Sequence, residues 1–308
     1  MKVAISIGDL NGVGIEIAIK SHEEIKKYVR PIYCINKTML NKAAKLLNYK
    51  IPHDFEIEEV KGDFEIKPGI VDAKSGEYSF NSFLKAIELA KTNKVDAITT
   101  LPINKEAWNK AGIKYKGHTE VLRDIFKKDA IMMLGCEKLY VALFTEHIPL
   151  SEVFKKIKKD NLVKFFLDFY NSTHFEKIGV LGLNPHAGDG GVLGDEEINE
   201  IIPAIKEANN ILKKEVFYGP LVPDTAFSKK KGNFIAMYHD QGLAPLKALY
   251  FDESINVSLN LPILRTSVDH GTAFDIAYKK IAKNKSYINA IKYIKTWLIS
   301  IKNYSPLI

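Results

Sequence analysis

Short apolar segments with strand character alternate with segments of helical periodicity through the first third of the chain. This alternation limits the fold, because strands joined by helices build a parallel sheet that is covered on both faces. Strands in such a sheet are buried on both sides, and the continuous apolar runs of this chain suit that position. The predicted strands are Val3–Ile7, Pro31–Ile35, Phe55–Val60 and Val95–Thr100, and the predicted helices are Ile15–Tyr28, a segment ending near Asn48, and Phe80–Thr92.

The pattern changes from Ile131 onward. Two apolar runs, Ile131–Cys136 and Leu139–Thr145, are separated by two residues only, which predicts an antiparallel hairpin. Further predicted elements are the strands Lys177–Leu183, Val216–Tyr218 and Phe234–Tyr238, a strand containing Asn256, and a final amphipathic helix, Tyr287–Lys302. We therefore predict an α/β protein of two domains with a cleft between them. Residues 1–128 and 269–308 would form the first domain, and residues 129–268 the second.

The composition is that of an ordered enzyme-sized chain. Of 308 residues 46% are hydrophobic and 26% charged, so a sizeable core can form. The two cysteines, Cys34 and Cys136, lie in apolar runs without zinc or disulfide spacing, which predicts a reducing cytoplasm. The apolar start is too short for a signal peptide, and no uncharged run reaches the roughly 20 residues of a membrane span. The net charge of +7 is carried by lysines that are not interleaved with aromatic residues, so we expect no nucleic-acid partner.

Five of the eight histidines stand at transitions between strands and loops, where α/β proteins place functional side chains. Three of these, His147, His186 and His239, each follow an apolar strand. If the strands are parallel, their carboxyl ends meet at one sheet edge, and three imidazoles could hold zinc, cobalt or nickel. Alternatively, each histidine only holds its own loop by a hydrogen bond. Asp240 adjoins His239 and could orient it or act as a base. His22, His53 and His174 stand among polar neighbours and are expected on the surface.

Residues suited to an anionic substrate gather between Tyr238 and Asp275. Lys247 and Arg265 offer positive charge, and arginine adds a planar fork that matches phosphate or carboxylate. Asn256 is a lone amide in an apolar strand and needs a polar partner there.

Two glycine-containing loops are candidate nucleotide contacts. The loop GDLNGVG (Gly8–Gly14) departs from the dinucleotide-binding pattern GxGxxG. The segment HGTAFDIA (His270–Ala277) is expected to open a helix, whose amino terminus would attract an anion. A standard Rossmann fold is therefore not predicted, and the second loop is the better candidate.

Six motifs in a fixed order together resemble one family closely, the 4-hydroxythreonine-4-phosphate dehydrogenases of vitamin B6 biosynthesis. They run through most of the chain, and their combination is far more specific than any one of them. The motifs are PINKEA (Pro102–Ala107), GHTE (Gly117–Glu120), NPHAGDGG (Asn184–Gly191), PDTAF (Pro223–Phe227), YHDQG (Tyr238–Gly242) and RTSVDHGTAFD (Arg265–Asp275).

The resemblance implies oxidation of the substrate at C3 by NAD or NADP, followed by decarboxylation to 3-amino-2-oxopropyl phosphate. It also implies a fold like those of isocitrate and isopropylmalate dehydrogenases, and a homodimer with active sites at the subunit interface. One zinc, cobalt or magnesium ion would be held by three histidines. The implied metal ligands are His147, His186 and His239, the substrate contacts His118, Thr119, Lys247, Asn256 and Arg265, and the cofactor contacts His270, Gly271 and Asp275. The candidate bases for the hydroxyl proton are Asp240, Asp224 and Lys105, which sequence alone does not rank.

The chain departs from the family pattern at two places. The family's opening loop usually reads GDPAGIGPE, whereas this chain reads GDLNGVGIE and gains Asn11. Where the family commonly continues with GKG after DHGTAFDIA, this chain has Tyr278, Lys279 and Lys280. Both changes border the expected cofactor region, so the preference between NAD and NADP stays open.

Three alternatives to this function remain. A paralogue acting on a phosphorylated threonate or erythronate would share the phosphate and metal residues. A phosphotransacylase of related fold would not need three histidines at strand ends. A metabolite-binding protein would bind its ligand without turnover.

Overall fold

The computed structural model describes residues 1–304, which divide into two compact units. Unit 1 contains Met1–Asp129, Ile255–Val257 and the chain from Leu261 onward, and unit 2 contains Ala130–Ser254 and Ser258–Asn260. The return to unit 1 thus comes earlier than the predicted residue 269. The reason is that strand β11 (Leu264–Val268) pairs with strand β4 (Ala97–Thr100) of unit 1.

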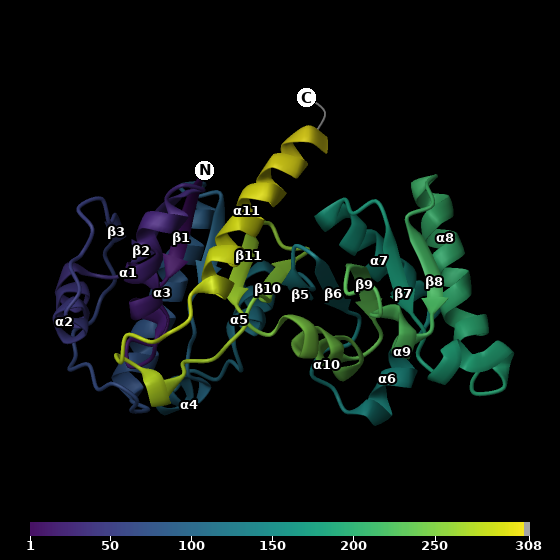
Figure 1. The fold of residues 1–308 in the computed structure, drawn as a ribbon, viewed down its shortest axis with the longest axis horizontal. Coiled ribbons are helices and arrows are strands. Elements are labelled where there is room, and N and C mark those ends of the chain that lie inside the picture. Colours follow the sequence, from purple (N-terminus) through teal and green to yellow (C-terminus); the bar gives the residue numbers. More distant parts are fainter. Residues whose placement is uncertain (305–308) are drawn as a thin grey trace. The chain divides into compact units, whose positions relative to one another are not determined.

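Unit 1 is built on a parallel sheet, as predicted. Its strands lie in the order β3-β2-β1-β4-β11 (Figure 1). The remaining strands are β1 (Lys2–Ser6), β2 (Arg30–Cys34) and β3 (Ile57–Glu58). Successive residues of β1 and β4 are fully buried, because helices cover both faces of the sheet. The predicted strand at residues 55–60 is only the two-residue edge strand β3, paired with β2.

The helices of unit 1 follow the predicted periodicity, with one large difference. They are α1 (Gly14–Ile25), α2 (Lys37–Leu47), α3 (Ala73–Lys91), α4 (Lys105–Lys110), α5 (His118–Phe126) and α11 (Lys285–Tyr304). Helix α3 packs on β1, β2 and β4, and α11 packs on β11, β4 and α1 (Figure 1). Helix α3 begins seven residues before the predicted start, because the Asp72 side chain caps it. Gly76 within it has a packing role, since a Cβ there would lie 2.3 Å from the carbonyl oxygen of Ala107.

The sheet of unit 2 begins with the predicted hairpin. Strands β5 (Ile131–Cys136) and β6 (Leu139–Leu143) are antiparallel, and the order continues β5-β6-β9-β7-β8. The other strands are β9 (Gly232–Ala236), β7 (Ile178–Leu181) and β8 (Phe217–Leu221). Strand β9 is parallel to β6, β7 is parallel to β9, and β8 is parallel to β7. Strand β10 (Ile255–Leu259), the predicted strand around Asn256, has residues in both units.

The helices of unit 2 are α6 (Leu150–Lys156), α7 (Lys159–Thr173), α8 (Ile202–Leu212), α9 (Pro223–Ala226) and α10 (His239–Tyr250). Helices α7 and α8 lie side by side, and α10 packs on β5, β6 and β9 (Figure 1). Leu243 and Leu246 of α10 meet Val141, Leu143 and Ala236 in the core of the unit. This core includes the last residues of β6, β7 and β9, the strands that the predicted metal ligands follow.

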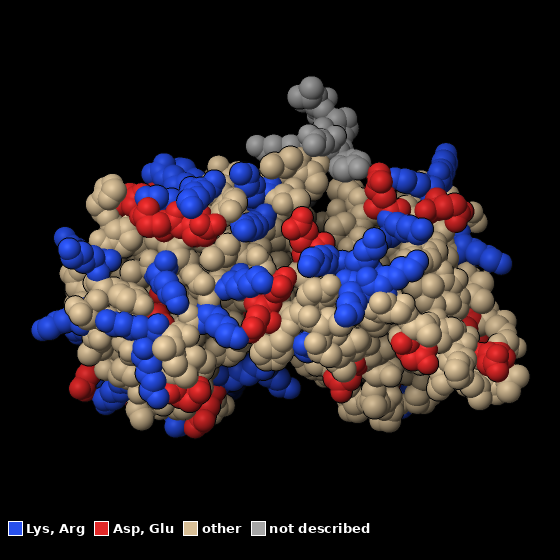
Figure 2. Space-filling model, in the orientation of Figure 1, with Lys and Arg blue, Asp and Glu red and all other residues tan. Residues whose placement is uncertain are grey.

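No helix in the described part of the chain is long and apolar enough to cross a membrane. On the face shown in Figure 2, lysine and arginine side chains are interspersed with aspartate and glutamate.

Candidate functional site

The carboxyl ends of β6, β9 and β7 are neighbours in unit 2, and one predicted metal ligand follows each strand. Leu143 of β6 is level with Ala236 of β9, and Ile235 of β9 is level with Val180 of β7. Because the strands are parallel, His147, His239 and His186 follow them at the same sheet edge. The predicted adjacency of these three strand ends is confirmed.

Two of the three imidazoles are close together. The ring centroids of His147 and His239 are 5.3 Å apart. His239 Nδ1 lies 2.7 Å from Asp240 Oδ1, so a proton on Nδ1 is donated to this carboxylate and Nε2 is left to bind a metal. His186 stands on the neighbouring loop. Within the described residues, the three histidines do not form a set whose ligating atoms all lie within 4.8 Å of one another.

The loop that carries His186 has a strained backbone. All residues from His186 to Gly191 have positive φ, and half of them are not glycine. A left-handed conformation costs about 1–2 kcal/mol for each non-glycine residue, so the surroundings must hold the loop. The buried Glu197 carboxylate does so by accepting hydrogen bonds from the backbone N–H groups of Leu183 and Asn184, at 2.7 and 2.8 Å. Strain of this kind concentrates at functional sites, which supports a role for this loop.

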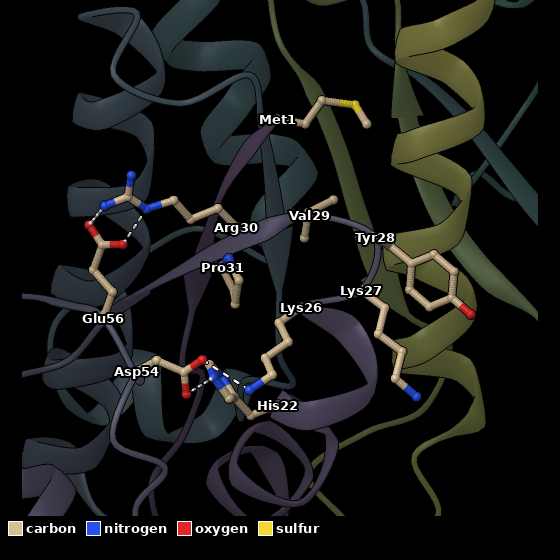
Figure 3. Close-up of a pocket in the computed structure, with 10 residues that line it drawn as sticks. All are labelled: Met1, His22, Lys26, Lys27, Tyr28, Val29, Arg30, Pro31, Asp54 and Glu56. Carbon is tan, nitrogen blue, oxygen red and sulfur yellow. Dashed lines mark hydrogen bonds and ion pairs between the residues drawn. The ribbon is translucent and has the colours of Figure 1, made fainter.

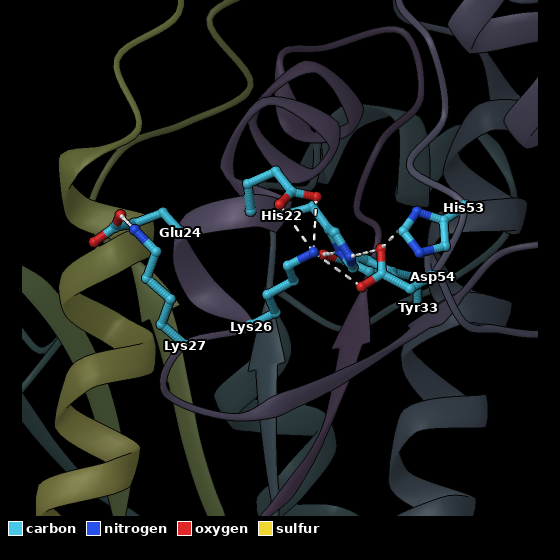
Figure 4. A network of polar contacts seen from close by, with 8 residues as sticks. His22, Glu24, Lys26, Lys27, Tyr33, His53 and Asp54 are labelled. Carbon is cyan, nitrogen blue, oxygen red and sulfur yellow. Dashed lines mark hydrogen bonds and ion pairs between the residues drawn. The ribbon is translucent and has the colours of Figure 1, made fainter.

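A separate cluster of one histidine and two carboxylates lies in unit 1 and is structural. His22, Glu23 and Asp54 are the one set of three possible ligands within 4.8 Å of one another in the described chain. The place of a cation there is taken by the ammonium of Lys26, which donates to Glu23 and Asp54 at 3.0 Å each (Figure 4). His22 also lies 3.0 Å from the Tyr33 hydroxyl, so this network joins α1 to β2.

The prediction that His22 lies on the surface was wrong, because its side chain is buried. Helical spacing from Ile15 and Ile19 places residue 22 on the apolar face of α1. His22 and Lys26 border a cavity of about 650 Å³ at the amino ends of β1 and β2 (Figure 3). The lysine and arginine side chains that line this cavity are paired with carboxylates, as Arg30 is with Glu56 at 2.7 Å. These cations are therefore already engaged and do not offer a site for an anionic ligand.

Arg265, His118 and Thr100 form a buried polar cluster in unit 1, at the carboxyl end of β4. Arg265 of β11 donates from Nε and Nη2 to Thr100 Oγ1 at 3.0 and 2.6 Å. Arg265 Nη2 also lies 3.2 Å from His118 Nδ1 at the start of α5. Burial lowers the pKa of Arg265 to about 9, which leaves the guanidinium charged at neutral pH.

Burial and the contact with Arg265 together determine the protonation and the tautomer of His118. Burial, and then the positive charge of Arg265, lower the pKa of His118 well below its ordinary value, so the ring is neutral. Arginine only donates, so Nδ1 accepts and the ring proton is on Nε2. The rings of Phe83 and Trp108 meet the imidazole edge-on, with centroids 4.6 and 5.6 Å away, and hold its orientation. Nε2 is buried and has no hydrogen-bond partner in the described residues. The cluster therefore presents an oriented neutral donor that is ready for an acceptor.

The other predicted residues of unit 1 differ in their surroundings. Thr119 is half-buried beside His118, and Lys105 is exposed at the start of α4. The Lys105 side chain lies next to Gly117, the residue before His118. Asn256 on β10 has a buried Oδ1 without a partner in the described chain, so the amide that the sequence singled out is available for a ligand.

Two further candidates belong to unit 2. Lys247 is half-buried on α10, with its Nζ 5.3 Å from the centroid of the Phe251 ring. Asp224 is exposed on α9, the short helix that contacts the His186 loop. Lys247 thus belongs to unit 2, as the three histidines do, whereas Arg265 and Asn256 belong to unit 1.

The prediction that His270–Ala277 opens a helix was wrong. The segment contains only a three-residue 3-10 turn, Phe274–Ile276, and the next helix begins at Lys285. Ala273 has φ of 44°, which interrupts a right-handed helix. Gly271 is surrounded by open space, Asp275 is exposed, and His270 Nε2 is buried without a partner in the described residues. The predicted anion site at a helix amino terminus is therefore absent from this segment.

The two departures from the family pattern have structural explanations. Tyr278 and Lys280 stand at the two glycine positions of GKG and have φ of 62° and 64°. This chain thus keeps a backbone conformation that glycine favours, and the Tyr278 hydroxyl anchors it by donating to the carbonyl oxygen of Leu10 at 2.7 Å. Asn11 binds the neighbouring loop, donating to Ile70 O and accepting from Lys67 N, each at 2.8 Å.

Sequence reasoning missed the residues that support the site. They share one signal, a polar side chain at or just beyond the end of a buried strand. Thr100 receives Arg265, and Thr145 and Gln241 bind the backbone between the histidine-bearing strands. Glu197, which holds the His186 loop, had no such signal in the sequence.

The chain is similar to known proteins of one family. Residues 27–294 match the model of the family described as "Pyridoxal phosphate biosynthetic protein PdxA". The 4-hydroxythreonine-4-phosphate dehydrogenase of Sulfurimonas denitrificans is 66% identical over 95% of this chain and 96% of that protein. The enzyme of the same name from Campylobacter fetus is 62% identical over the same shares.

Among solved structures, the 4-hydroxythreonine-4-phosphate dehydrogenase from Klebsiella pneumoniae superposes with a TM-score of 0.81 at 34% identity. The superposition covers 96% of this chain and 97% of that one, which confirms the predicted α/β fold. With its motifs, its fold and these relatives in agreement, the chain belongs to the PdxA family of 4-hydroxythreonine-4-phosphate dehydrogenases.

Proposed function

We propose that this protein oxidises 4-hydroxy-L-threonine phosphate at C3 with NAD or NADP and a divalent metal, in vitamin B6 biosynthesis. The nicotinamide, when bound, would supply the oxidant for C3, and a base of this chain would take the hydroxyl proton. Loss of carbon dioxide and return of a proton to C2 would then leave 3-amino-2-oxopropyl phosphate. The observation that carries the proposal is that three histidines follow three adjacent parallel strands. One of them, His239, contacts the Asp240 carboxylate through Nδ1, which leaves Nε2 for a metal.

The donor set fits zinc or cobalt. His147, His186 and His239 would be the ligands, and three imidazoles with an open position are typical of catalytic zinc. Magnesium prefers oxygen ligands and suits this set less well. When bound, the metal supplies Lewis-acid stabilisation of negative charge that develops on the substrate.

The chain's own residues would bind and orient the anionic substrate. Arg265 supplies a buried positive charge, and the neutral His118 supplies an oriented N–H donor from Nε2. Thr119, Asn256 and Lys247 complete the proposed contacts, and Asn256 brings an amide oxygen that has no partner in the described chain.

The three candidate bases have different geometry. Asp240 is engaged with His239, so we assign it the orientation of that imidazole rather than proton transfer. Lys105 lies next to Gly117, beside the His118 cluster, whereas Asp224 lies on the helix that contacts the His186 loop. Both remain candidates for the base.

The nicotinamide cofactor would contact His270, Gly271 and Asp275. The buried and unpartnered His270 Nε2 supports a polar contact there, and the open space around Gly271 allows close approach of a ligand. We further propose a cytoplasmic homodimer with interfacial active sites, as the family resemblance implies.

The test is formation of reduced nicotinamide, followed by absorbance, when the metal-reconstituted protein receives 4-hydroxy-L-threonine phosphate. His186→Ala should lower kcat/KM by at least about 100-fold, since loss of an outer contact to a ligand alone costs about 10–100-fold. His53→Ala is the matched control, because the His53 side chain is 93% exposed and far from these strand ends in sequence. Unchanged turnover in His186→Ala would refute the metal assignment.

The alternative functions give different outcomes in the same assay. Turnover only with phosphorylated threonate or erythronate would identify a paralogue. Acyl transfer between phosphate and a thiol carrier that persists without metal would identify a phosphotransacylase. Binding of the hydroxy-amino acid phosphate without turnover would leave a binding protein.

A further inference from the structure

Side-chain hydrogen bonds join β6, β9 and β7 just beyond the ends of these strands. The centre of the arrangement is the backbone of Met237, which directly follows β9. Its carbonyl oxygen accepts from the Thr145 hydroxyl at 2.6 Å and from the Thr145 N–H at 3.2 Å. Its N–H donates to Gln241 Oε1 at 2.8 Å, and Gln241 Nε2 donates to the carbonyl oxygen of Gly182 at 2.6 Å.

These contacts continue the sheet where the regular ladder stops. The pairing of β9 with β7 ends at Ile235 and Val180. Beyond this point Gln241 connects the two segments that follow these strands, through Met237 N and Gly182 O. Thr145 and Gln241 are buried, so water does not compete for their hydrogen bonds. The oxygen of the Gln241 amide accepts a hydrogen bond and its nitrogen donates one. A carboxylate could not replace it, because it has no proton to donate to the Gly182 carbonyl oxygen.

The positions of these residues relate them to the proposed metal ligands. Thr145 precedes His147 by two residues, and Gln241 follows His239 by two residues. Gly182 lies on the chain that leads into the His186 loop. The hydrogen bonds therefore fix the starting points of all three histidine-bearing segments relative to one another.

We propose that Gln241 and Thr145 are positioning residues that set the spacing of the three histidines and thereby the metal affinity of the protein. This inference rests on the proposed metal-dependent function. Neither residue needs to touch the metal, because each acts through the backbone on the histidines.

The test is the affinity of metal-free protein for Co²⁺ alone, measured by titration of the visible absorption, with no substrate or cofactor present. Gln241→Met keeps the length of the side chain and removes both hydrogen bonds, and should weaken Co²⁺ binding by about 10–100-fold. Gln241→Glu, which keeps the acceptor and loses the donor, should also weaken binding and serves if the methionine variant does not fold.

Asn209→Leu is the matched control. Asn209 is a buried amide in the same unit that also binds backbone at the end of a strand, donating to Phe217 O at 2.8 Å and accepting from Phe217 N at 2.9 Å. It lies at the amino end of β8, the edge opposite the histidines. Its loss should lower the melting temperature and leave the Co²⁺ affinity unchanged.

Thr145 provides a second, independent comparison. Thr145→Val removes the hydroxyl at nearly constant shape and should weaken Co²⁺ binding, whereas Thr145→Ser should restore it. Wild-type affinity in folded Gln241→Met and Thr145→Val would overturn the positioning role alone. Absence of Co²⁺ binding by the wild type would instead overturn the proposed metal site, and the positioning role with it.

Discussion

Replacing Asp9 with asparagine should change how the stability of unit 1 depends on pH. Asp9 is fully buried in the loop after β1. Its Oδ1 accepts from the N–H of Asn11 at 2.9 Å and from the Ser75 hydroxyl, whereas Oδ2 has no partner in the described residues. Burial outweighs these hydrogen bonds and raises the pKa of Asp9 from 3.8 to about 6.

The magnitude follows from the difference between the folded and unfolded states. Above the pKa of the unfolded chain, the folded chain still holds a proton that the unfolded chain has lost. Stability from this group is therefore fully present below about pH 4 and declines until about pH 6. The two pKa values differ by about 2, and each unit corresponds to about 1.4 kcal/mol, so the decline is about 3 kcal/mol. Asp9→Asn keeps an acceptor oxygen and is neutral throughout, so it should remove this decline.

The assay is urea unfolding between about pH 4 and pH 7, followed by tryptophan fluorescence. Both tryptophans, Trp108 and Trp297, belong to unit 1, so the signal reports the unit that contains Asp9. Asp63→Asn is the control, because this carboxylate is 60% exposed and its loss should leave the pH dependence nearly unchanged.

The expected result is that Asp9→Asn is more stable than the wild type near pH 7 by up to about 3 kcal/mol and nearly equal to it near pH 4. Parallel curves for the wild type and Asp9→Asn across this range would refute the reasoning, because they would mean that Asp9 binds no extra proton in the folded state.

Three other changes have defined outcomes. Arg265→Lys should lower kcat/KM for the phosphorylated substrate by about 10–100-fold, because an ammonium cannot reproduce the planar contacts to Thr100 and His118; an unchanged value would remove Arg265 from the site. Tyr278→Phe loses the hydrogen bond to Leu10 O and should lower the free energy of unfolding of unit 1 by about 1 kcal/mol in the same urea assay; equal midpoints would show that this anchor is idle. A chelator should abolish dehydrogenase turnover and added Zn²⁺ or Co²⁺ should restore it, whereas turnover that survives chelation would contradict metal dependence.

Local pattern was enough to predict most of the sheet. Apolar runs marked β1, β2, β4 and the β5–β6 hairpin, since burial on both faces requires continuous apolar sequence. The same pattern predicted that His147, His186 and His239 each follow a strand whose end could lie at one sheet edge, and the structure shows that these strands are neighbours. The pattern failed for residues 270–277, which form a turn instead of the start of a helix, and the neighbouring Gly8–Gly14 loop stabilises this turn through the hydrogen bond from Val13 N to Thr272 O.

The sequence by itself thus determined the largely parallel α/β layout, the histidines that follow strands and the family to which the motifs belong. Only the tertiary structure decided which polar side chains meet. Arg265 reaches His118 across 147 residues of sequence, and Gln241 reaches Gly182 across 59. Periodicity describes a residue's own strand or helix, whereas such contacts depend on how distant elements pack, and packing is a property of the whole folded unit.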